Sequence, residues 1–456
     1  MTPESFLNGK VILHSGDCLY RLRDLDSNSI DSCVTDPPYH LTNNTGSRSP
    51  NPGQYTPIGK PKEPKGGFMG KQWDGGDIAF QRDTWERVFR VLKPGAHLLA
   101  FGGTRTYHRL ACAIEDAGFE IRDQVQWMFG QGFPKSLNVA IEFEQRLCKQ
   151  IVRGGRKIWV YIADGADMAR VPPFRDDDAN EWAGFGTALK PAVEPICLAR
   201  KPLSESTVAA NVLKWGTGAL NIDGCRVGTD GATKRSHQEA YGAEGRADQG
   251  GGQNWRTGHE IIELNQGRWP ANVIHDGSEE ATAGFPTDLK SGDLTGQPRT
   301  ENNIYGSAAS TLGTPRYHQG DSGSAARYFY SAKADSDDRL GSKHPTVKPL
   351  DLIEYLERLV TPPGGTILDP FAGTGTAGEA AFRQGFKAVL IEREPEYQAD
   401  IRRRMALCMA GPDERKRESI KARTKDKPAD HGPLFGGPNL AAAAESGSDI
   451  KVGLSK

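Results

Sequence analysis

Residues 369–378 read D-P-F-A-G-T-G-T-A-G, and this stretch decides how the rest of the chain is interpreted. It follows an apolar segment, 366–368, that predicts a strand, and it runs into 376–383, which predicts a helix. Glycines at such a junction let the backbone pass close to a ligand, because they lack a Cβ. The pattern therefore predicts a cofactor site at the end of a strand in an α/β sheet.

The glycine spacing by itself fits more than one cofactor. Gly373, Gly375 and Gly378 match G-x-G-x-x-G, and Glu392 stands 19 residues beyond Gly373. This is the spacing of a dinucleotide-binding fingerprint, so a nicotinamide-dependent oxidoreductase is one alternative. A phosphate-binding loop is excluded, because no Gly-Lys-Ser/Thr follows the glycines.

An acidic residue beside the glycines favours a different ligand. Asp369 and Pro370 stand at the predicted strand end, where a fixed carboxylate would repel a pyrophosphate and attract a cation or an amino group. S-adenosylmethionine carries a sulfonium and an α-ammonium, and its ribose diol suits an acidic acceptor on the next strand, where Glu392 ends A-V-L-I-E. These residues favour S-adenosylmethionine, and the alternative that Glu392 is a surface carboxylate stays open.

A second informative stretch, T-D-P-P-Y-H, occupies residues 35–40 and follows the apolar run 30–34. The Asp36 carboxylate and the Pro37 carbonyl are acceptors that cannot donate, which suits the two N–H donors of an exocyclic amine. The Tyr39 ring offers a face on which a planar base can stack. The stretch predicts a site that binds a nucleobase amino group, with a rigid Pro-Pro turn as the alternative.

Composition sets broad limits on the protein. The chain has 456 residues and a net charge of −1, so nucleic-acid binding would depend on local Lys/Arg patches rather than on an overall field. Its seven scattered cysteines lack C-x-x-C spacing, which predicts reduced thiols and no metal site. No apolar run is long enough to span a membrane and no signal pattern is present, so a cytoplasmic location is expected.

Strand and helix patterns alternate in two separated blocks, 1–140 and 327–410. Strands are predicted at 11–13, 30–36, 97–101, 120–129, 366–368 and 388–392, and helices at 19–25, 78–92, 104–117, 350–360, 376–383 and 396–409. Neither block has enough strands for a typical sheet. The predicted fold is therefore α/β, with a doubly wound, mostly parallel sheet assembled from both chain ends.

The remaining segments show less regular patterns. Residues 42–72 are rich in Gly, Pro and Asn and predict a mobile loop after the strand 30–36, either one that closes over a substrate or a tolerated insertion. Residues 141–326 predict a large insert, partly disordered, with helical sequence at 140–151 and strand-like segments at 193–199 and 269–275. Residues 411–456 have no periodicity and predict a disordered tail.

The combination of motifs carries a family resemblance. T-D-P-P-Y upstream, with H-P-T-V-K-P at 344–349, D-P-F-A-G-T-G-T and I-E downstream, resembles the amino-group DNA methyltransferases of bacteria and phages. The order of the motifs, with an insert between them, is similar to the β class of that family. The resemblance covers roughly 8–140 and 327–410, and it implies one S-adenosylmethionine-dependent methyltransferase domain, with 141–326 as a target-recognition region.

The resemblance also implies roles for individual residues. Asp36 and Pro37 would accept hydrogen bonds from the target amine, and Tyr39 would stack on a flipped-out base. Thr346 and Lys348 would flank the carboxylate end of the cofactor. The implied catalytic residues are Asp36, Pro37, Pro38 and Tyr39. The implied cofactor-binding residues are Asp17 and Cys18 at the adenine ring, Asp369, Pro370, Phe371, Gly373 and Gly375 at the methionine part, Glu392 at the ribose, and Thr346 and Lys348.

The implied activity is site-specific methylation of double-stranded DNA, of the restriction-modification type. In the family D-P-P-Y goes mostly with adenine N6 and S-P-P-Y with cytosine N4, so adenine N6 is predicted and cytosine N4 is the alternative. Methyltransferases of protein glutamine or RNA generally place the glycine motif first, opposite to the order here. A DNA-binding protein that has lost activity, a homodimer and a partner nuclease all stay open.

The insert is expected to read the DNA sequence, because arginine pairs bidentately with guanine. Two tryptophans, Trp215 and Trp269, are expected in the core of the insert. The candidate base-reading residues are Arg153, Arg156, Lys157, Arg200, Lys201, Arg268 and Asn272.

Overall fold

The computed structural model describes most of the two predicted blocks and part of the insert. The described residues are 2–39, 77–130, 132, 136, 139, 148–153, 156–161, 182–228, 233–238, 259–264, 267–290, 294–295, 317–318, 322–332, 336–344 and 346–424. His40 and the predicted loop 42–72 lie outside these residues.

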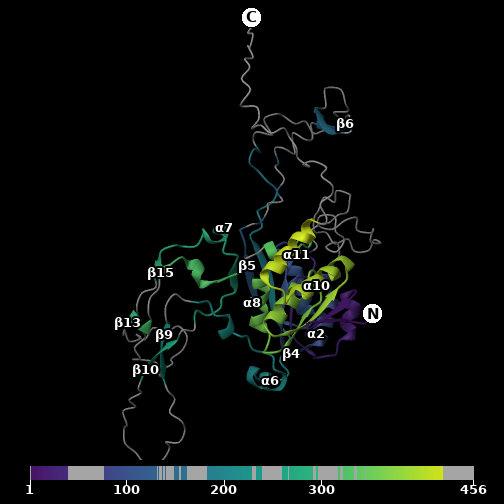
Figure 1. Ribbon diagram of the computed structural model, residues 1–456. Helices are drawn as coiled ribbons and strands as arrows, with labels where there is room; N and C mark the ends of the chain where they lie inside the picture. Colours follow the sequence, from purple (N-terminus) through teal and green to yellow (C-terminus); the bar gives the residue numbers. More distant parts are fainter. Residues whose placement is uncertain are drawn as a thin grey trace, which may run out of the picture.

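One ten-stranded sheet forms the centre of the molecule (Figure 1). Strands from β2 to β4 run parallel, β8 is antiparallel to both its neighbours, and β5, β11 and β16 are again parallel to one another. The fold class is confirmed, since β18 and β17 from the C-terminal block lie between β2 and β3. In spatial order the strands are β1 (Glu4–Phe6), β2 (Val11–Ser15), β18 (Lys387–Glu392), β17 (Thr366–Asp369), β3 (Ile30–Thr35), β4 (Leu92–Phe101), β8 (Val193–Arg200), β5 (Glu120–Met128), β11 (Val273–His275) and β16 (Tyr330–Ser331).

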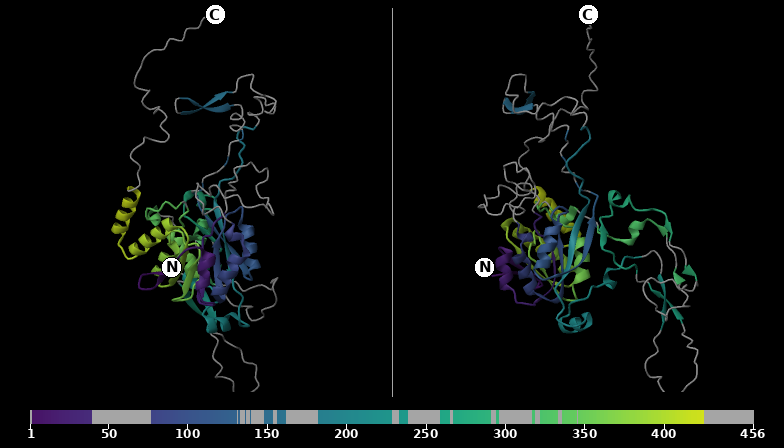
Figure 2. Two further views of the ribbon diagram at one scale, coloured as in Figure 1. Left: turned by 90° about the vertical axis from the view of Figure 1, so that its right-hand side faces the viewer. Right: turned by 180° about the vertical axis from the view of Figure 1, so that it is seen from behind.

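Helices cover both faces of the sheet, which is why its central strands are apolar on both sides (Figure 2). Cys33 and Leu98 face one helical layer, and the alternating residues Val34 and Leu99 face the other. The first layer contains α1 (Cys18–Arg21), η1 (Leu22–Asp24), η4 (Ile78–Phe80), α2 (Arg82–Val91) and α3 (Tyr107–Asp116). The second contains α8 (Leu350–Val360), α9 (Thr376–Arg383) and α10 (Pro395–Leu407).

The insert is not separate from the ten-stranded sheet. Strand β8, which includes the predicted strand 193–199, lies between β4 and β5, and β11 pairs with β5. The sequence division at residue 141 did not anticipate this, because strand pairing over such distances leaves no local signal. Within the described residues the insert also forms four small antiparallel pairs, of which three are β9 (Thr233–Gln238) with β10 (His259–Leu264), β12 (Leu289–Lys290) with β15 (Ser322–Gly323), and β13 (Leu294–Thr295) with β14 (Tyr317–His318).

Two secondary-structure predictions are wrong. The predicted helix 140–151 is a strand over its described end, where β6 (Cys148–Arg153) pairs antiparallel with β7 (Arg156–Tyr161). The predicted disordered tail begins with a helix, α11 (Pro412–Thr424). Tertiary contact explains the helix, because Arg415 forms an ion pair of 2.7 Å with the fully buried Glu379 of α9.

The remaining described helices are α6 (Val208–Trp215), η6 (Asp223–Cys225), α7 (Glu279–Thr282), η9 (Ala325–Tyr328) and η10 (Ser336–Arg339). In the described part of the chain, every helix is too short or too polar to cross a membrane.

Candidate active site

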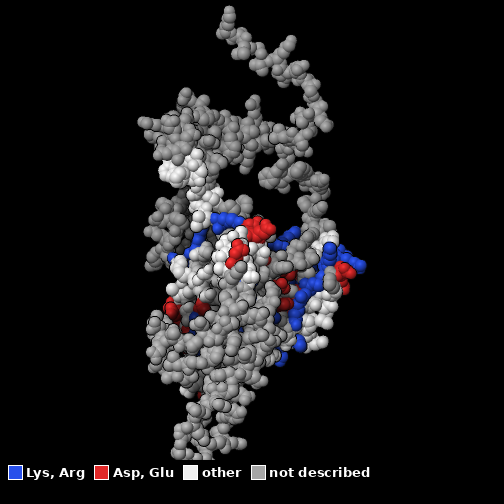
Figure 3. Space-filling view, turned by 90° about the vertical axis from the view of Figure 1, so that its left-hand side faces the viewer, with Lys and Arg blue, Asp and Glu red and all other residues white. Residues whose placement is uncertain are grey.

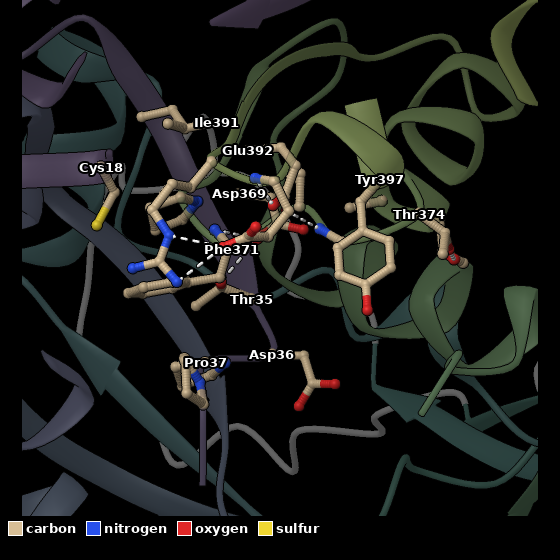
Figure 4. Close-up of a pocket in the computed structure, with 18 of the residues that line it drawn as sticks. Cys18, Thr35, Asp36, Pro37, Asp369, Phe371, Thr374, Ile391, Glu392 and Tyr397 are labelled. Carbon is tan, nitrogen blue, oxygen red and sulfur yellow. Dashed lines mark hydrogen bonds and ion pairs between the residues drawn. The ribbon is translucent and has the colours of Figure 1, made fainter. Parts of the chain in front are cut away.

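A cavity of about 560 Å³ lies where β2, β3, β17 and β18 end. Carboxyl ends of parallel strands meet at one edge of a sheet, and ligands of open α/β sheets bind there. Both sequence motifs reach this cavity (Figure 4). The predicted site residues that line it are Asp17, Cys18, Asp36, Pro37, Pro38, Tyr39, Thr346, Lys348, Asp369, Pro370, Phe371, Gly373 and Glu392.

Gly375 does not line the cavity. It precedes α9 with a φ of +79°, where a Cβ would lie 3.1 Å from the Ile401 side chain. Its place therefore requires glycine for backbone conformation and for close packing. Its predicted contact with the cofactor stays a prediction.

A direct hydrogen bond joins the two motifs. Strands β3 and β17 are parallel neighbours, with Cys33 in register with Leu368. As a result the Thr35 hydroxyl donates to Asp369 Oδ1 over 2.7 Å, although the two residues are 334 positions apart. The residue before Asp36 thus anchors the first acid of the glycine-rich stretch.

Asp369 is a buried carboxyl at the tip of β17, with 6% of its surface exposed. Burial raises its pKa to about 7, against the lowering effect of the hydrogen bonds from Thr35 and from the Phe371 N–H. A group poised near neutrality responds strongly to a nearby cation, which would favour its ionised form.

Glu392, at the tip of β18, holds the glycine loop. Its Oε2 accepts from the Gly373 N–H and its Oε1 from the Glu394 N–H, each over 2.8 Å. Burial raises the pKa of this carboxyl to about 7. Glu392 is 8% exposed, so the alternative of a surface carboxylate is wrong.

The turn after β2 forms another wall of the cavity. Asp17 caps α1 by accepting from the Leu19 N–H over 2.9 Å. Cys18 is 5% exposed, and burial raises the pKa of its thiol to about 12. The thiol is therefore a neutral wall of the cavity.

Asp36 stands across the open space from Asp369 and Glu392 (Figure 4). Its Oδ2 lies 2.8 Å from the Lys348 ammonium. Its Oδ1 is buried and has no hydrogen-bond partner within the described part of the chain. An unpartnered buried acceptor is costly, so this oxygen is suited to accept from a ligand.

The sequence placed Lys348 at the carboxylate end of the cofactor, whereas the structure places its ammonium on Asp36 and on Glu194. Tyr39 joins the same cluster, because its hydroxyl donates to Glu194 Oε2 over 3.2 Å. The Tyr39 carbonyl accepts from Thr106, which fixes the backbone after the two prolines.

Several residues at or beside the cavity were missed as site residues, among them Glu194 and His344. Glu194 lies on β8, and its only sequence signal is a charge at the start of an apolar strand. His344 begins the H-P-T-V-K-P motif; its ring packs edge-on against Tyr397 at 4.5 Å, and burial lowers its pKa to about 4. A buried neutral histidine beside an aromatic ring shapes the cavity wall.

Several predicted base-reading residues have structural contacts instead. The Lys201 ammonium donates to Asn28, to the Phe89 carbonyl and to the Leu92 carbonyl, so the prediction for Lys201 is wrong. Arg200 pairs with Glu120 over 2.7 Å.

Two further candidates from the insert also have contacts within the protein, and their base-reading role stays a prediction. Arg268 donates to the Gly228 and Arg327 carbonyls, and Asn272 donates to Asp123. Trp269 is 65% exposed, so its predicted core position is wrong. The side chains of Arg153, Arg156 and Lys157 lie outside what the structure describes.

The model of a DNA methylase family, N6_N4_Mtase, matches residues 30–403. This range contains both motifs, the insert and the whole cavity-forming edge from β3 onward. The chain belongs to this family of DNA methylases. S-adenosylmethionine is the methyl donor that this family uses.

Among curated relatives, the chain is 26% identical over 232 residues to the type II methyltransferase M.HindIII of Haemophilus influenzae, a match covering 46% of this chain and 64% of that protein. It is 41% identical over 68 residues to the type II methyltransferase M2.DpnII of Streptococcus pneumoniae, a match covering 15% of this chain and 25% of that protein. The chain thus spans less than two thirds of the length of either relative.

Among solved structures, the cytosine-N4-specific PvuII DNA methyltransferase is similar with 13% identity and a TM-score of 0.40, covering 93% of this chain and 97% of that one. The M1.HpyAVI–SAM complex is similar with 14% identity and a TM-score of 0.34, covering 86% of this chain and 99% of that one.

Proposed function

We propose that this chain is an S-adenosylmethionine-dependent DNA methyltransferase that modifies the exocyclic amine of a flipped-out base. The proposed target is adenine N6, and cytosine N4 is the alternative. One observation carries the proposal: Asp36 and Asp369, 333 positions apart in sequence, line the same cavity and are joined through Thr35. A nicotinamide-dependent oxidoreductase leaves Asp36 and the two prolines after it without a role.

The residues at the cavity fit the methyl donor. Asp369 and Glu392 present carboxyl groups whose pKa burial raises to about 7, and a ligand bearing an ammonium and a diol would satisfy both. S-adenosylmethionine would supply there a methyl group made electrophilic by the sulfonium. Its predicted partners in this chain are Asp17, Cys18, Thr346, Asp369, Pro370, Phe371, Gly373 and Glu392.

On the catalytic side, the residues of the chain would hold the target amine. Asp36 Oδ1 is the unpartnered acceptor, and the Pro37 carbonyl would supply the second one. Two acceptors would draw the amine hydrogens toward themselves and localise the lone pair, which in an aryl amine is delocalised into the ring. Fixed orientation of the reactants can contribute about 7–11 kcal/mol to the rate.

The target atom lies inside the base stack, so the base must leave the duplex at a cost of a few kcal/mol. Pro38 would keep the chain rigid after Asp36, and Tyr39 would offer a ring beside the base. No covalent intermediate with the enzyme is needed, since the amine itself is the nucleophile.

DNA contact would depend on local groups rather than on overall charge. Figure 3 shows Lys and Arg side chains in groups that include Asp or Glu on the described part of one face. The region 141–326 is proposed to recognise the target sequence. Restriction-modification as the biological role belongs to the same proposal, and the names of the type II relatives support it.

The decisive experiment expresses the chain in a host without DNA methylation and maps modified bases by single-molecule sequencing. We expect N6-methyladenine at one defined sequence, and none in a host expressing Asp36→Ala at the same level. N4-methylcytosine would contradict the adenine assignment, and unmodified DNA would contradict the proposed function.

A further inference from the structure

The Lys348 ammonium is saturated by contacts within the cavity wall. It has three N–H donors. It lies 2.8 Å from Asp36 Oδ2, 3.0 Å from Glu194 Oε2 and 3.1 Å from the Tyr39 hydroxyl. Its side chain is only 7% exposed. Contact with another anion would therefore require one of these three partners to be given up.

Glu194 is the member of this cluster that comes from the insert. It lies on β8, opposite Trp127 of β5, and is 22% exposed. Its Oε2 accepts from both Lys348 and Tyr39. One carboxylate oxygen thus ties the lysine to the tyrosine of the D-P-P-Y stretch.

The apolar surroundings of the Lys348 ammonium explain why two carboxylates, Asp36 and Glu194, lie beside it. The Lys348 ammonium lies 4.9 Å from the centre of the Phe101 ring and 5.2 Å from that of Tyr39. Burial in such a place lowers the pKa of a lysine, but Asp36 and Glu194 outweigh this effect, and the pKa of Lys348 is raised. The ammonium therefore stays charged at neutral pH.

We propose that Lys348 and Glu194 are positioning residues: Glu194 holds the Lys348 ammonium on Asp36 Oδ2, so that Oδ1 alone faces the target amine. This inference rests on the proposed function. It assigns a role in the reaction to a residue of the insert, and it moves Lys348 from the cofactor to Asp36.

Replacing Glu194 by Gln keeps the shape of the side chain and removes its charge. The lysine then loses one of its two anionic partners, so its ammonium is no longer fixed in place on Asp36 Oδ2. A small misplacement of a reacting group can reduce the rate about 100-fold. Because Glu194 is not among the residues that line the cavity, cofactor affinity should not change.

The test compares Glu194→Gln and Lys348→Met with the matched control Glu120→Gln, a carboxylate of β5 that pairs with Arg200 over 2.7 Å. Single-turnover methylation is measured at saturating DNA, and binding of S-adenosylhomocysteine by calorimetry. We expect rates about 100-fold lower for both cluster variants, with unchanged affinity for S-adenosylhomocysteine. The control should behave as wild type. A wild-type rate for Glu194→Gln, or a parallel loss of cofactor affinity, would overturn the inference.

A second measurement uses the protein without any ligand. Lys348→Met leaves two carboxylates without their cation and should lower the midpoint of denaturant unfolding. Adding Glu194→Gln to that variant should restore part of the loss, because the two residues interact directly. Strictly additive effects would overturn the inference. If wild-type protein modifies no DNA, the proposed function fails, and this cycle still decides whether Glu194 holds Lys348.

Discussion

The two sides of the cavity are built in different ways. On the cofactor side, Asp369 accepts from the Phe371 N–H, and Glu392 accepts from the N–H groups of Gly373 and Glu394. On the catalytic side, Asp36 is held by the side chain of Lys348, which in turn depends on Glu194. The first side is thus a local loop, and the second is a long-range assembly of charges. Substitutions on the two sides should therefore affect different quantities.

The largest effect is expected on the catalytic side. Asp36→Ala removes the unpartnered acceptor and should abolish methylation, measured as transfer of labelled methyl groups to DNA. The cofactor loop does not depend on this side chain, so calorimetric binding of S-adenosylhomocysteine should persist. Turnover near that of wild type would contradict the proposed mechanism.

The counterpart on the cofactor side is Asp369→Ala. It removes a buried carboxyl and leaves the Thr35 hydroxyl and the Phe371 N–H without their acceptor. Hydrogen bonds to charged groups contribute about 1.5–3 kcal/mol, so cofactor affinity should fall by roughly 10- to 100-fold. Thr35→Val, which keeps the carboxyl, should have a smaller effect. Unchanged affinity in Asp369→Ala would contradict the placement of the cofactor.

The cofactor side should also respond to pH. Asp369 and Glu392 have pKa values raised to about 7 from 3.8 and 4.5, so the folded protein binds protons that the unfolded chain has released. Stability of the free protein should therefore fall as pH rises from about 4 to above 7. Affinity for the cationic cofactor should rise over the upper part of this range, as the carboxyls ionise. Thermal unfolding and calorimetry across this range would check both trends, and an affinity that falls with rising pH would contradict them.

A residue outside both sides offers a stability test. Glu357 of α8 is fully buried, and neither carboxyl oxygen has a partner in the described residues. Burial raises its pKa well above the ordinary value, which favours the protonated carboxyl in the folded protein. Glu357→Leu should stabilise the protein by about 1–3 kcal/mol at neutral pH, since an unsatisfied polar group is removed. The gain should shrink in acid, where the unfolded carboxyl is protonated too. Denaturant unfolding at two pH values measures this gain in the free energy of unfolding. A variant less stable than wild type would contradict the prediction.

The smallest effect is expected in the insert. Trp269 is 65% exposed, with the Arg226 guanidinium 5.2 Å from its ring. If the insert contacts DNA here, Trp269→Ala should weaken DNA binding by about 1 kcal/mol, the lower end of the range for one base–aromatic stack. Tyr20→Ala, which removes an aromatic ring that is 67% exposed on α1, is the matched control. Equal DNA affinity in both variants would contradict this contact.

Much of the fold followed from local sequence. Strands buried on both faces are apolar runs, and apolar residues in helices recur every three to four positions. The first and last residues of α8 and α9 were therefore predicted correctly. Both ends of the chain were predicted to share one sheet, because neither had enough strands alone. The cofactor loop was equally predictable, since its carboxyls bind N–H groups only two and 19 positions away.

Only the tertiary structure decided the rest. Strand β8 lies antiparallel between β4 and β5, and this places Glu194 against Tyr39, which is 155 positions away in the sequence. Lys348 reaches Tyr39 across 309 positions. Helix α11 is held by a buried glutamate of α9. A charge on an isolated segment carries no signal of its partner, because ion pairs over such distances depend on strand order, and strand order is set by packing of the whole sheet.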